Sequence, residues 1–177
     1  MTNTWVKENV KLTKYEANHD QKTIKWLQDE TIRDSFGHTY VPNLLEHRNW
    51  IESLKDTFVW AIYDNELNVH CGNILLFVNP KHYSAFFQIY IGESMSRGKG
   101  IAKNTLIIIL DFAFEELKLN RVWLNVFPEN KKALNLYESL GFIKEGIERQ
   151  SHYYNSCFRN QLRYSMLKSD WTNRVRD

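Results

Sequence analysis

SRGKGIAKNT, residues 96–105, is the stretch that decides the fold. Gly98 and Gly100 lie between an apolar run with the alternation of a strand (residues 85–92) and a long apolar run with helical spacing (residues 101–117). Glycine permits a positive φ angle and lets a ligand approach the backbone closely. The free N–H groups at the start of a helix, reinforced by the helix dipole, attract anions. The turn is therefore a candidate site for a phosphate or pyrophosphate group.

Two well-known phosphate motifs do not match this turn. A P-loop, GxxxxGK[ST], ends in a hydroxyl residue that binds magnesium, but Gly92 lies one residue too far away and Gly100 stands where the hydroxyl is needed. A dinucleotide fingerprint, GxGxxG, requires a glycine at the position of Lys103 and belongs to a leading βαβ unit. From the turn alone, an ordinary strand-to-helix connection on the surface remains equally open.

The apolar spacing along the chain predicts one strand, two helices, three strands, a helix, a strand, a helix and two strands. The predicted strands are residues 5–12, 58–64, 70–78, 85–92, 121–127, 142–149 and 158–167. The predicted helices are residues 19–33, 44–54, 101–117 and 129–141, the last closed by Gly141. The three central strands read as an antiparallel meander. This order predicts a mixed α/β sheet and excludes a doubly wound parallel sheet.

The composition excludes several classes of protein. With 177 residues and 43% hydrophobic content, the chain fits a single domain over residues 1–177. A net charge of +2 without a basic stripe argues against nucleic acid as a partner. No stretch resembles a signal peptide or a membrane span, so we expect a soluble, cytoplasmic protein with no membrane partner. Cys71 and Cys157 are far apart and the histidines are scattered, which argues against a metal site.

Two motifs carry a resemblance to a known family. The stretch from Arg97 to Ala102 has Arg, two free positions, Gly, one free position and Ala, which resembles the acetyl-CoA motif of the GNAT N-acetyltransferases. VFPENKKALNLYESLGF, residues 126–142, resembles the second signature of that family, a strand, an Asn and a helix ending in LYxxxGF. The resemblance covers roughly residues 57–168 and looks closest to the ribosomal-protein and amino-sugar branch. It implies a mostly antiparallel central sheet flanked by helices, with acetyl-CoA (coenzyme A) as the cofactor.

The resemblance also implies roles for individual residues. Backbone groups around Ile89 and Ile91 would pair with the pantetheine arm, and an amide there would donate to the thioester oxygen. Asn130 would contact the pantetheine, and Tyr137 would protonate the departing thiolate. These two lie seven residues apart, so one helix face presents both about 10 Å from each other. The pyrophosphate would be held by the backbone amides of Arg97, Gly98, Lys99, Gly100, Ile101 and Ala102. The structural alternatives are a helix N-cap for Asn130 and a core residue for Tyr137.

The general base is missing from the expected position. Many members of this family carry Glu after Ala on the strand before the pyrophosphate turn, but here Phe86 follows Ala85. A phenyl ring cannot accept a proton. Glu93, His38 and His152, or a chain of water molecules, are conceivable replacements.

The amine acceptor is expected between the N-terminal helices and the last strands, at residues 31–41 and 149–157. These segments hold aromatic residues and a few cations but no dense carboxylate cluster, which favours an amino sugar or its nucleotide over a polyamine. A polyamine, a protein N-terminus, or a coenzyme-binding regulatory module without catalysis remain alternatives. A homodimer is also conceivable.

Overall fold

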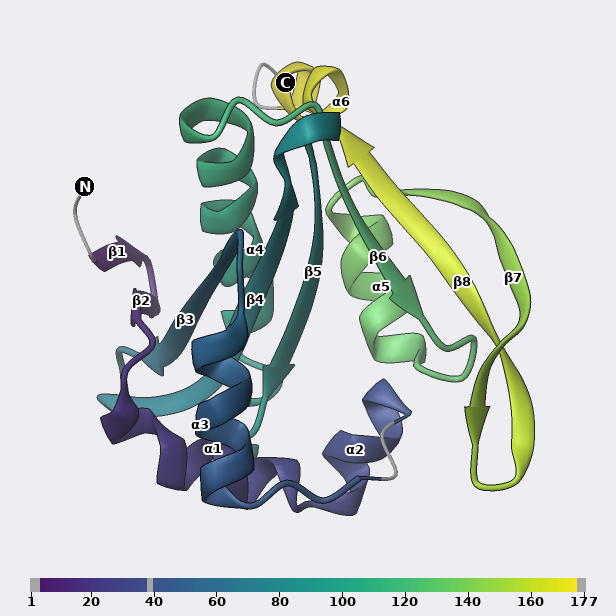
Figure 1. Cartoon of the computed structure of the whole chain (residues 1–177). Helices are drawn as coiled ribbons and strands as arrows, with labels where there is room; N and C mark the ends of the chain where they lie inside the picture. Colours follow the sequence, from purple (N-terminus) through teal and green to yellow (C-terminus); the bar gives the residue numbers. More distant parts are fainter. Residues whose placement is uncertain (1–3, 38–39, 175–177) are drawn as a thin grey trace.

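The computed structural model describes residues 4–37 and 40–174, which form a mixed sheet covered by helices (Figure 1). The strands are β1 (Thr4–Lys7), β2 (Val10–Lys14), β3 (Thr57–Asp64), β4 (Val69–Asn79), β5 (Ser84–Ile91), β6 (Arg121–Val126), β7 (Ile143–Tyr154) and β8 (Cys157–Leu167). Their spatial order is β1-β2-β3-β4-β5-β6-β8-β7. All neighbours are antiparallel except β5 and β6. The predicted mixed, mostly antiparallel sheet is confirmed.

Helices cover both faces of this sheet (Figure 1). They are α1 (Asp20–Leu27), α2 (Glu30–Phe36), α3 (Leu44–Ser53), α4 (Ile101–Asp111), α5 (Lys131–Ser139) and α6 (Lys168–Arg174), with short 3-10 turns η1 (Ala17–His19), η2 (Pro80–His82) and η3 (Ser94–Ser96) and a π-helical turn η4 (Phe112–Glu116). Alternate residues of a strand face opposite sides. On β4, Ile74 and Leu76 join the buried core with Leu106 of α4, whereas Asn73 and Leu75 face a pocket beneath α1–α3.

The N-terminal third departs from the prediction. Residues 5–12 do not form one strand but parts of β1 and β2, because the chain turns at Glu8, which has a φ angle of 49°. Residues 19–33 do not form one helix either. Asp29 is extended, and its side chain accepts hydrogen bonds from the N–H groups of Thr31 and Ile32, so it ends α1 and caps a new helix, α2. Apolar periodicity continues across such a break and does not reveal it.

The other predicted helices occupy the expected places with different details. Predicted helix 44–54 is α3, but Leu44 and Leu45 are 40% and 68% exposed, and the buried residue is His47. Predicted helix 101–117 is α4 followed by η4. Predicted helix 129–141 is the shorter α5, and Gly141, with a φ angle of 83°, closes it one residue after the C-cap. Helix α6 was not predicted.

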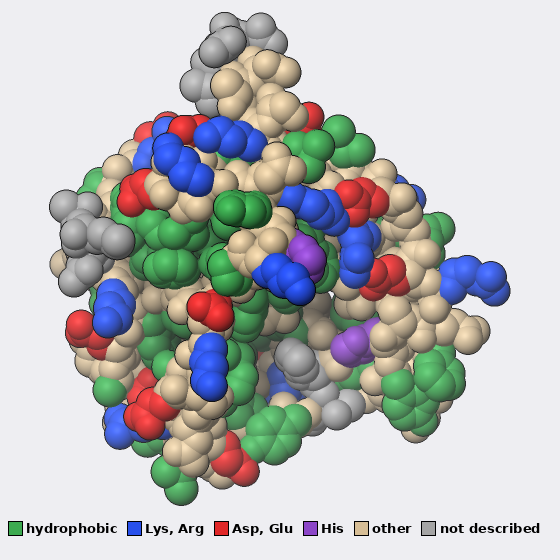
Figure 2. All heavy atoms as spheres, turned by 45° about the horizontal axis from the view of Figure 1, so that its top comes forward, with side chains coloured by type: hydrophobic (Ala, Val, Ile, Leu, Met, Phe, Trp, Pro, Cys, Tyr) green, Lys and Arg blue, Asp and Glu red, His purple; other side chains and the backbone are tan. Residues whose placement is uncertain are grey.

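Charged side chains of both signs lie on the surface (Figure 2). Figure 2 shows basic and acidic side chains interspersed over one face of the molecule. No helix within the described ranges is long and apolar enough to cross a membrane. The same residues contain no group of His, Cys, Asp and Glu arranged to hold a metal ion.

Candidate active site

The sheet opens between β5 and β6. These parallel strands pair only from Ser84 to Phe86 against Arg121 to Trp123, although β5 continues to Ile91 and β6 to Val126. Beyond the pairs they diverge (Figure 1). The far edge of Phe87–Ile91 therefore faces a gap instead of a neighbouring strand. An extended ligand arm can pair with such a free edge as an added strand would.

The predicted pyrophosphate turn lies next to this gap, at the start of α4. Gly98 and Gly100 have φ angles of 79° and 78°, and no protein atom lies within 4 Å of a Cβ added at either position. Among the described residues, the backbone N–H groups of Gly98, Gly100, Ile101 and Ala102 have no hydrogen-bond acceptor. Several free donors thus face open space at the positive end of an 11-residue helix. This arrangement suits an anionic diphosphate.

The side chains of this turn point elsewhere. Arg97 donates through Nε to the carbonyl of Ile91 (3.0 Å) and through Nη2 to that of Gly92 (3.2 Å). Lys99 Nζ lies 3.4 Å from Asp64 Oδ2 and 3.5 Å from Glu66 Oε2. Both cations therefore fasten the turn to the strands. The backbone N–H of Arg97, which was predicted to hold the pyrophosphate, donates instead to the carbonyl of Ser94 at 3.1 Å, so the free N–H groups of the turn begin at Gly98.

The second motif lies on α5, beside β5. Tyr137 is 8% exposed, and its ring packs edge-on against Phe87 of β5 and Phe142 at 5.9 and 5.8 Å between centroids. Burial raises the pKa of the Tyr137 phenol, so it stays protonated and able to donate at neutral pH. Asn130 accepts from the N–H of Ala133 at 3.2 Å and caps α5, as the structural alternative predicted.

A pocket of about 630 Å³ opens on the opposite face, beneath α1–α3. Much of its wall is aromatic, and Glu46 and Arg33 bring the formal charges among the residues that line it. It reaches Gln88 and Tyr90, on the half of β5 that borders the gap. The lining residues are Tyr15, Thr23, Leu27, Arg33, Phe36, Tyr40, Pro42, Glu46, His47, Trp50, Ile51, Val59, Asn73, Leu75, Phe77, Gln88 and Tyr90.

This pocket corrects the predicted acceptor segments in part. Residues 31–41 contribute Arg33, Phe36 and Tyr40, as expected. Residues 149–157 do not line the pocket. Instead they brace α2, because His152 Nε2 lies 2.8 Å from the carbonyl of Gly37 and the Tyr154 hydroxyl donates to Asp34. Most of the remaining wall comes from α3 and the central strands, which sequence reasoning did not place there.

A comparison with protein families decides what this combination of gap, glycine turn and pocket is. The acetyltransferase (GNAT) domain matches residues 9–143, most of the chain. The chain belongs to the GNAT family. It is an N-acetyltransferase that uses acetyl-CoA, as the sequence resemblance implied.

Individual GNAT relatives are similar over most of the chain. The spermidine N(1)-acetyltransferase of Vibrio cholerae is 37% identical over 100 residues, 56% of this chain and 57% of that protein. The putative ribosomal N-acetyltransferase YdaF of Bacillus subtilis is 28% identical over 93% of this chain and 88% of its own length. A crystal structure of the Vibrio cholerae spermidine N-acetyltransferase with CoA and spermine superposes with a TM-score of 0.85 at 25% identity, covering 93% of this chain and 99% of that one.

In this GNAT protein, the described residues that were considered as positions for the general base make other contacts. Phe86 packs its ring against Trp123 and Phe77, at 4.7 and 5.8 Å between centroids. Glu93 pairs with Lys22 at 3.3 Å, and neither Glu93 nor His152 lines the pocket. His38 lies outside the described residues.

Proposed function

We propose that this protein transfers the acetyl group of acetyl-CoA to the primary amine of a small molecule held in the pocket beneath α1–α3. The observation that carries the proposal is that this pocket reaches Gln88 and Tyr90 on the same half of β5 whose far edge faces the gap. An amine in the pocket and a thioester along the strand edge would therefore meet across β5.

The residues of the glycine turn and of β5 fit a coenzyme. Acetyl-CoA supplies the activated acyl group. The free amides from Gly98 to Ala102 would hold its diphosphate, and the edge of Phe87–Ile91 would pair with the pantetheine. A strand N–H aimed at the thioester oxygen would stabilise the oxyanion, and such a donor contributes about 3 kcal/mol to lowering the barrier.

Tyr137 is the proposed general acid. Its ring lies against Phe87, and its hydroxyl has no hydrogen-bond partner among the described residues. A free, protonated phenol at the edge of the gap can donate its proton to the sulfur as the C–S bond breaks.

The pocket favours an acceptor with one ammonium group and a ring-shaped or apolar body, such as an amino sugar. Aromatic walls bind the faces of sugar rings and single cations, while a polyamine with several ammonium groups needs several carboxylates. Glu46 is the one carboxylate among the described lining residues. A polyamine is the second candidate, because three of the similar proteins are named spermidine N(1)-acetyltransferases.

Thiol release from acetyl-CoA tests these candidates. The panel contains glucosamine, an amino-sugar nucleotide, spermidine and a short peptide with a free N-terminus. We expect the highest kcat/KM with an amino sugar. Glu46→Gln should raise the KM for that amine. Preference for spermidine would establish the second candidate, and turnover of the peptide alone would contradict the small-molecule proposal.

A further inference from the structure

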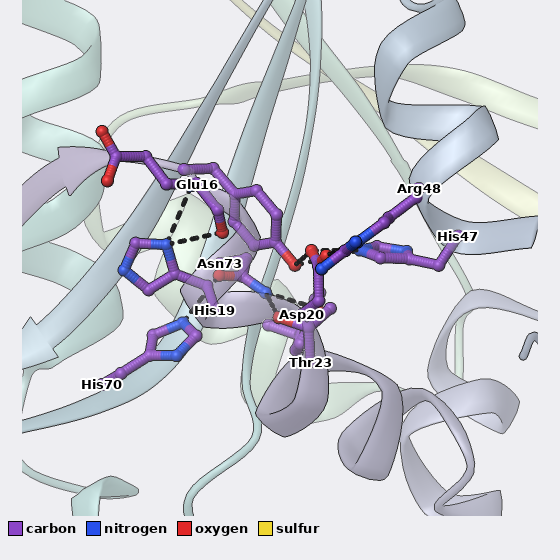
Figure 3. Close-up of polar contacts among 10 residues, drawn as sticks. Glu16, His19, Asp20, Thr23, His47, Arg48, His70 and Asn73 are labelled. Atoms are coloured by element: carbon purple, nitrogen blue, oxygen red, sulfur yellow. Dashed lines mark hydrogen bonds and ion pairs between the residues drawn. The ribbon is translucent and has the colours of Figure 1, made fainter. Parts of the chain in front are cut away.

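The pocket wall contains one neutral base that the proposed mechanism has not used. His47 on α3 is 4% exposed and lines the pocket. Its Nε2 lies 2.9 Å from the hydroxyl of Tyr15, another lining residue. The Tyr15 hydroxyl in turn donates to Oδ1 of Asp20 at 3.0 Å, and Arg48 Nε donates to the other carboxylate oxygen at 2.7 Å. In Figure 3, Arg48 and the imidazole of His47 both lie beside Asp20.

This arrangement fixes the tautomer of His47. The Tyr15 hydroxyl has one hydrogen, and the carboxylate of Asp20, which is paired with Arg48, is the stronger acceptor. The hydroxyl oxygen must then accept from His47, so Nε2 carries the hydrogen. The lone pair is left on Nδ1, for which the described residues provide no hydrogen-bond partner. A chain of hydrogen bonds from a carboxylate through a hydroxyl to an imidazole holds the ring in place, as enzymes do for a basic histidine.

We propose that His47 is the general base of this enzyme and takes a proton from the acceptor ammonium on Nδ1, with Tyr15 and Asp20 as positioning residues. The inference rests on the proposed function. It supplies the proton acceptor that Phe86 cannot provide.

The protons balance over the reaction. An acceptor ammonium loses two protons on its way to the amide. His47 takes the first, which frees the nitrogen lone pair to attack the thioester carbonyl, and later releases it to water. As the new C–N bond forms and the C–S bond breaks, Tyr137 gives its proton to the sulfur. The second nitrogen proton restores the Tyr137 phenol.

The charges around His47 suit this role. Burial lowers the pKa of His47, which keeps the imidazole neutral before substrate arrives, while the charge of Asp20 opposes that shift. Once protonated, the ring lies 3.8 Å from Asp20 Oδ1. Arg48 binds Asp20 from the outer side, and Glu46 lines the same pocket. The ring of His19, whose pKa is lowered by burial, lies tilted against Tyr15 at 5.3 Å between centroids.

A polar strip connects this base with β5. The amide of Asn73 on β4 donates to Thr23 Oγ1 at 2.8 Å and to the Tyr90 hydroxyl at 2.7 Å, and its oxygen lies 2.8 Å from His70 Nε2. Thr23, Asn73 and Tyr90 all line the pocket, as Tyr15 and His47 do. Polar groups thus lie along an otherwise apolar wall from His47 to Tyr90 of β5. Figure 3 shows Thr23 and Asn73, two residues of this strip.

The experiment measures kcat/KM against pH for the parent protein and for His47→Gln, Tyr15→Phe and Asp20→Asn, with glucosamine and spermidine as the amines. For His47→Gln we expect a loss of about 10²- to 10⁴-fold near neutral pH, disappearance of the acidic limb of the profile, and partial recovery at high pH, where the free amine accumulates. Tyr15→Phe and Asp20→Asn should shift that limb and reduce kcat with little change in KM for the amine. His82→Gln, an exposed histidine on η2, is the matched control.

Acetyl-CoA affinity, measured by calorimetry, confirms that each variant is folded. A histidine-selective NMR titration of the parent adds a readout without turnover. We expect the His47 resonance to titrate below pH 6.5 and to move in Tyr15→Phe. A parent that acetylates an amine while His47→Gln keeps the same profile would overturn the base assignment alone. Absence of turnover with every amine would overturn the proposed function, and the base with it.

Discussion

The side chain of Lys99, from the middle of the pyrophosphate turn, reaches across to the fully buried carboxylate of Asp64 at the end of β3, with 3.4 Å between Nζ and Oδ2. The same carboxylate accepts from Ser96 Oγ at 2.8 Å and from the N–H groups of Glu66 and Leu67. Burial alone would raise the pKa of Asp64, but these hydrogen bonds and Lys99 hold it below its ordinary value. Asp64 therefore anchors both the β3–β4 hairpin and the turn.

Replacing this anchor should affect stability and coenzyme binding together. Asp64→Ala leaves several buried donors and Lys99 without their acceptor, so we expect a loss of about 3 kcal/mol in the free energy of unfolding and weaker acetyl-CoA binding. Urea unfolding and calorimetry measure the two effects. Glu66→Ala removes the exposed partner of the same lysine and should change stability by less than about 0.5 kcal/mol. Equal effects of the two variants would refute the anchoring role.

Gly100 provides a direct test of the pyrophosphate site. Gly100→Asp should weaken acetyl-CoA binding at least about tenfold, because the added carboxylate fills the open space before the free amides and repels the diphosphate. Gly100→Asn separates charge from strain, since Asn tolerates the left-handed conformation and carries no charge. Gly146→Asp, at a position with open space and no positive φ, is the control. Unchanged affinity in Gly100→Asp would remove the diphosphate from this turn.

Tyr137→Phe should separate catalysis from binding. We expect kcat to fall by about 10²-fold or more while acetyl-CoA affinity and stability stay near those of the parent, because the lost hydroxyl has no partner among the described residues. Tyr164→Phe is the matched control. Its hydroxyl donates to Glu138 at 2.8 Å, so this change should cost about 1 kcal/mol of stability and leave kcat alone. If Tyr137→Phe turned over at the parental rate, another group would protonate the thiolate.

The sequence predicted the parts of the site that local chemistry determines. The positive φ angles at Gly98 and Gly100 and the closure of α5 at Gly141 follow from glycine itself, and the structure confirms all three. The antiparallel meander follows from the alternation of strand residues, and β3–β5 confirm it. These features depend on neighbours within a few residues along the chain.

The pocket wall could not be predicted in the same way. Tyr15 lies in the connection after β2, Asp20 begins α1, and His47 lies on α3. Nothing in the sequence shows that His47 meets the other two. One signal was available in the sequence: His47 lies at helical spacing from the apolar residues Leu44, Ile51 and Leu54, and a histidine on such a side of a helix needs a buried partner. Which partner it finds depends on how α1 and α3 cross the sheet, and that is a property of tertiary packing.

The buried histidines predict how stability depends on pH. Burial lowers the pKa of His70 from 6.5 to about 4, despite hydrogen bonds from its ring to Asn73 and Gly72. Between these values the unfolded chain binds a proton that the folded chain does not. The stability is therefore fully present above about pH 6.5 and is lost as pH falls toward 4, by on the order of 3 kcal/mol.

His70→Gln tests this pH dependence, because glutamine keeps an N–H donor but does not titrate in this range. Urea unfolding from about pH 7.5 to about pH 4.5 should therefore show a shallower decline for His70→Gln than for the parent, with the remainder due partly to His19 and His47, whose pKa values burial also lowers. His82→Gln, which replaces an exposed histidine, should keep the parental slope. If His70→Gln also kept the parental slope, the imidazole of His70 in the parent would be protonated as easily in the folded protein as in the unfolded chain.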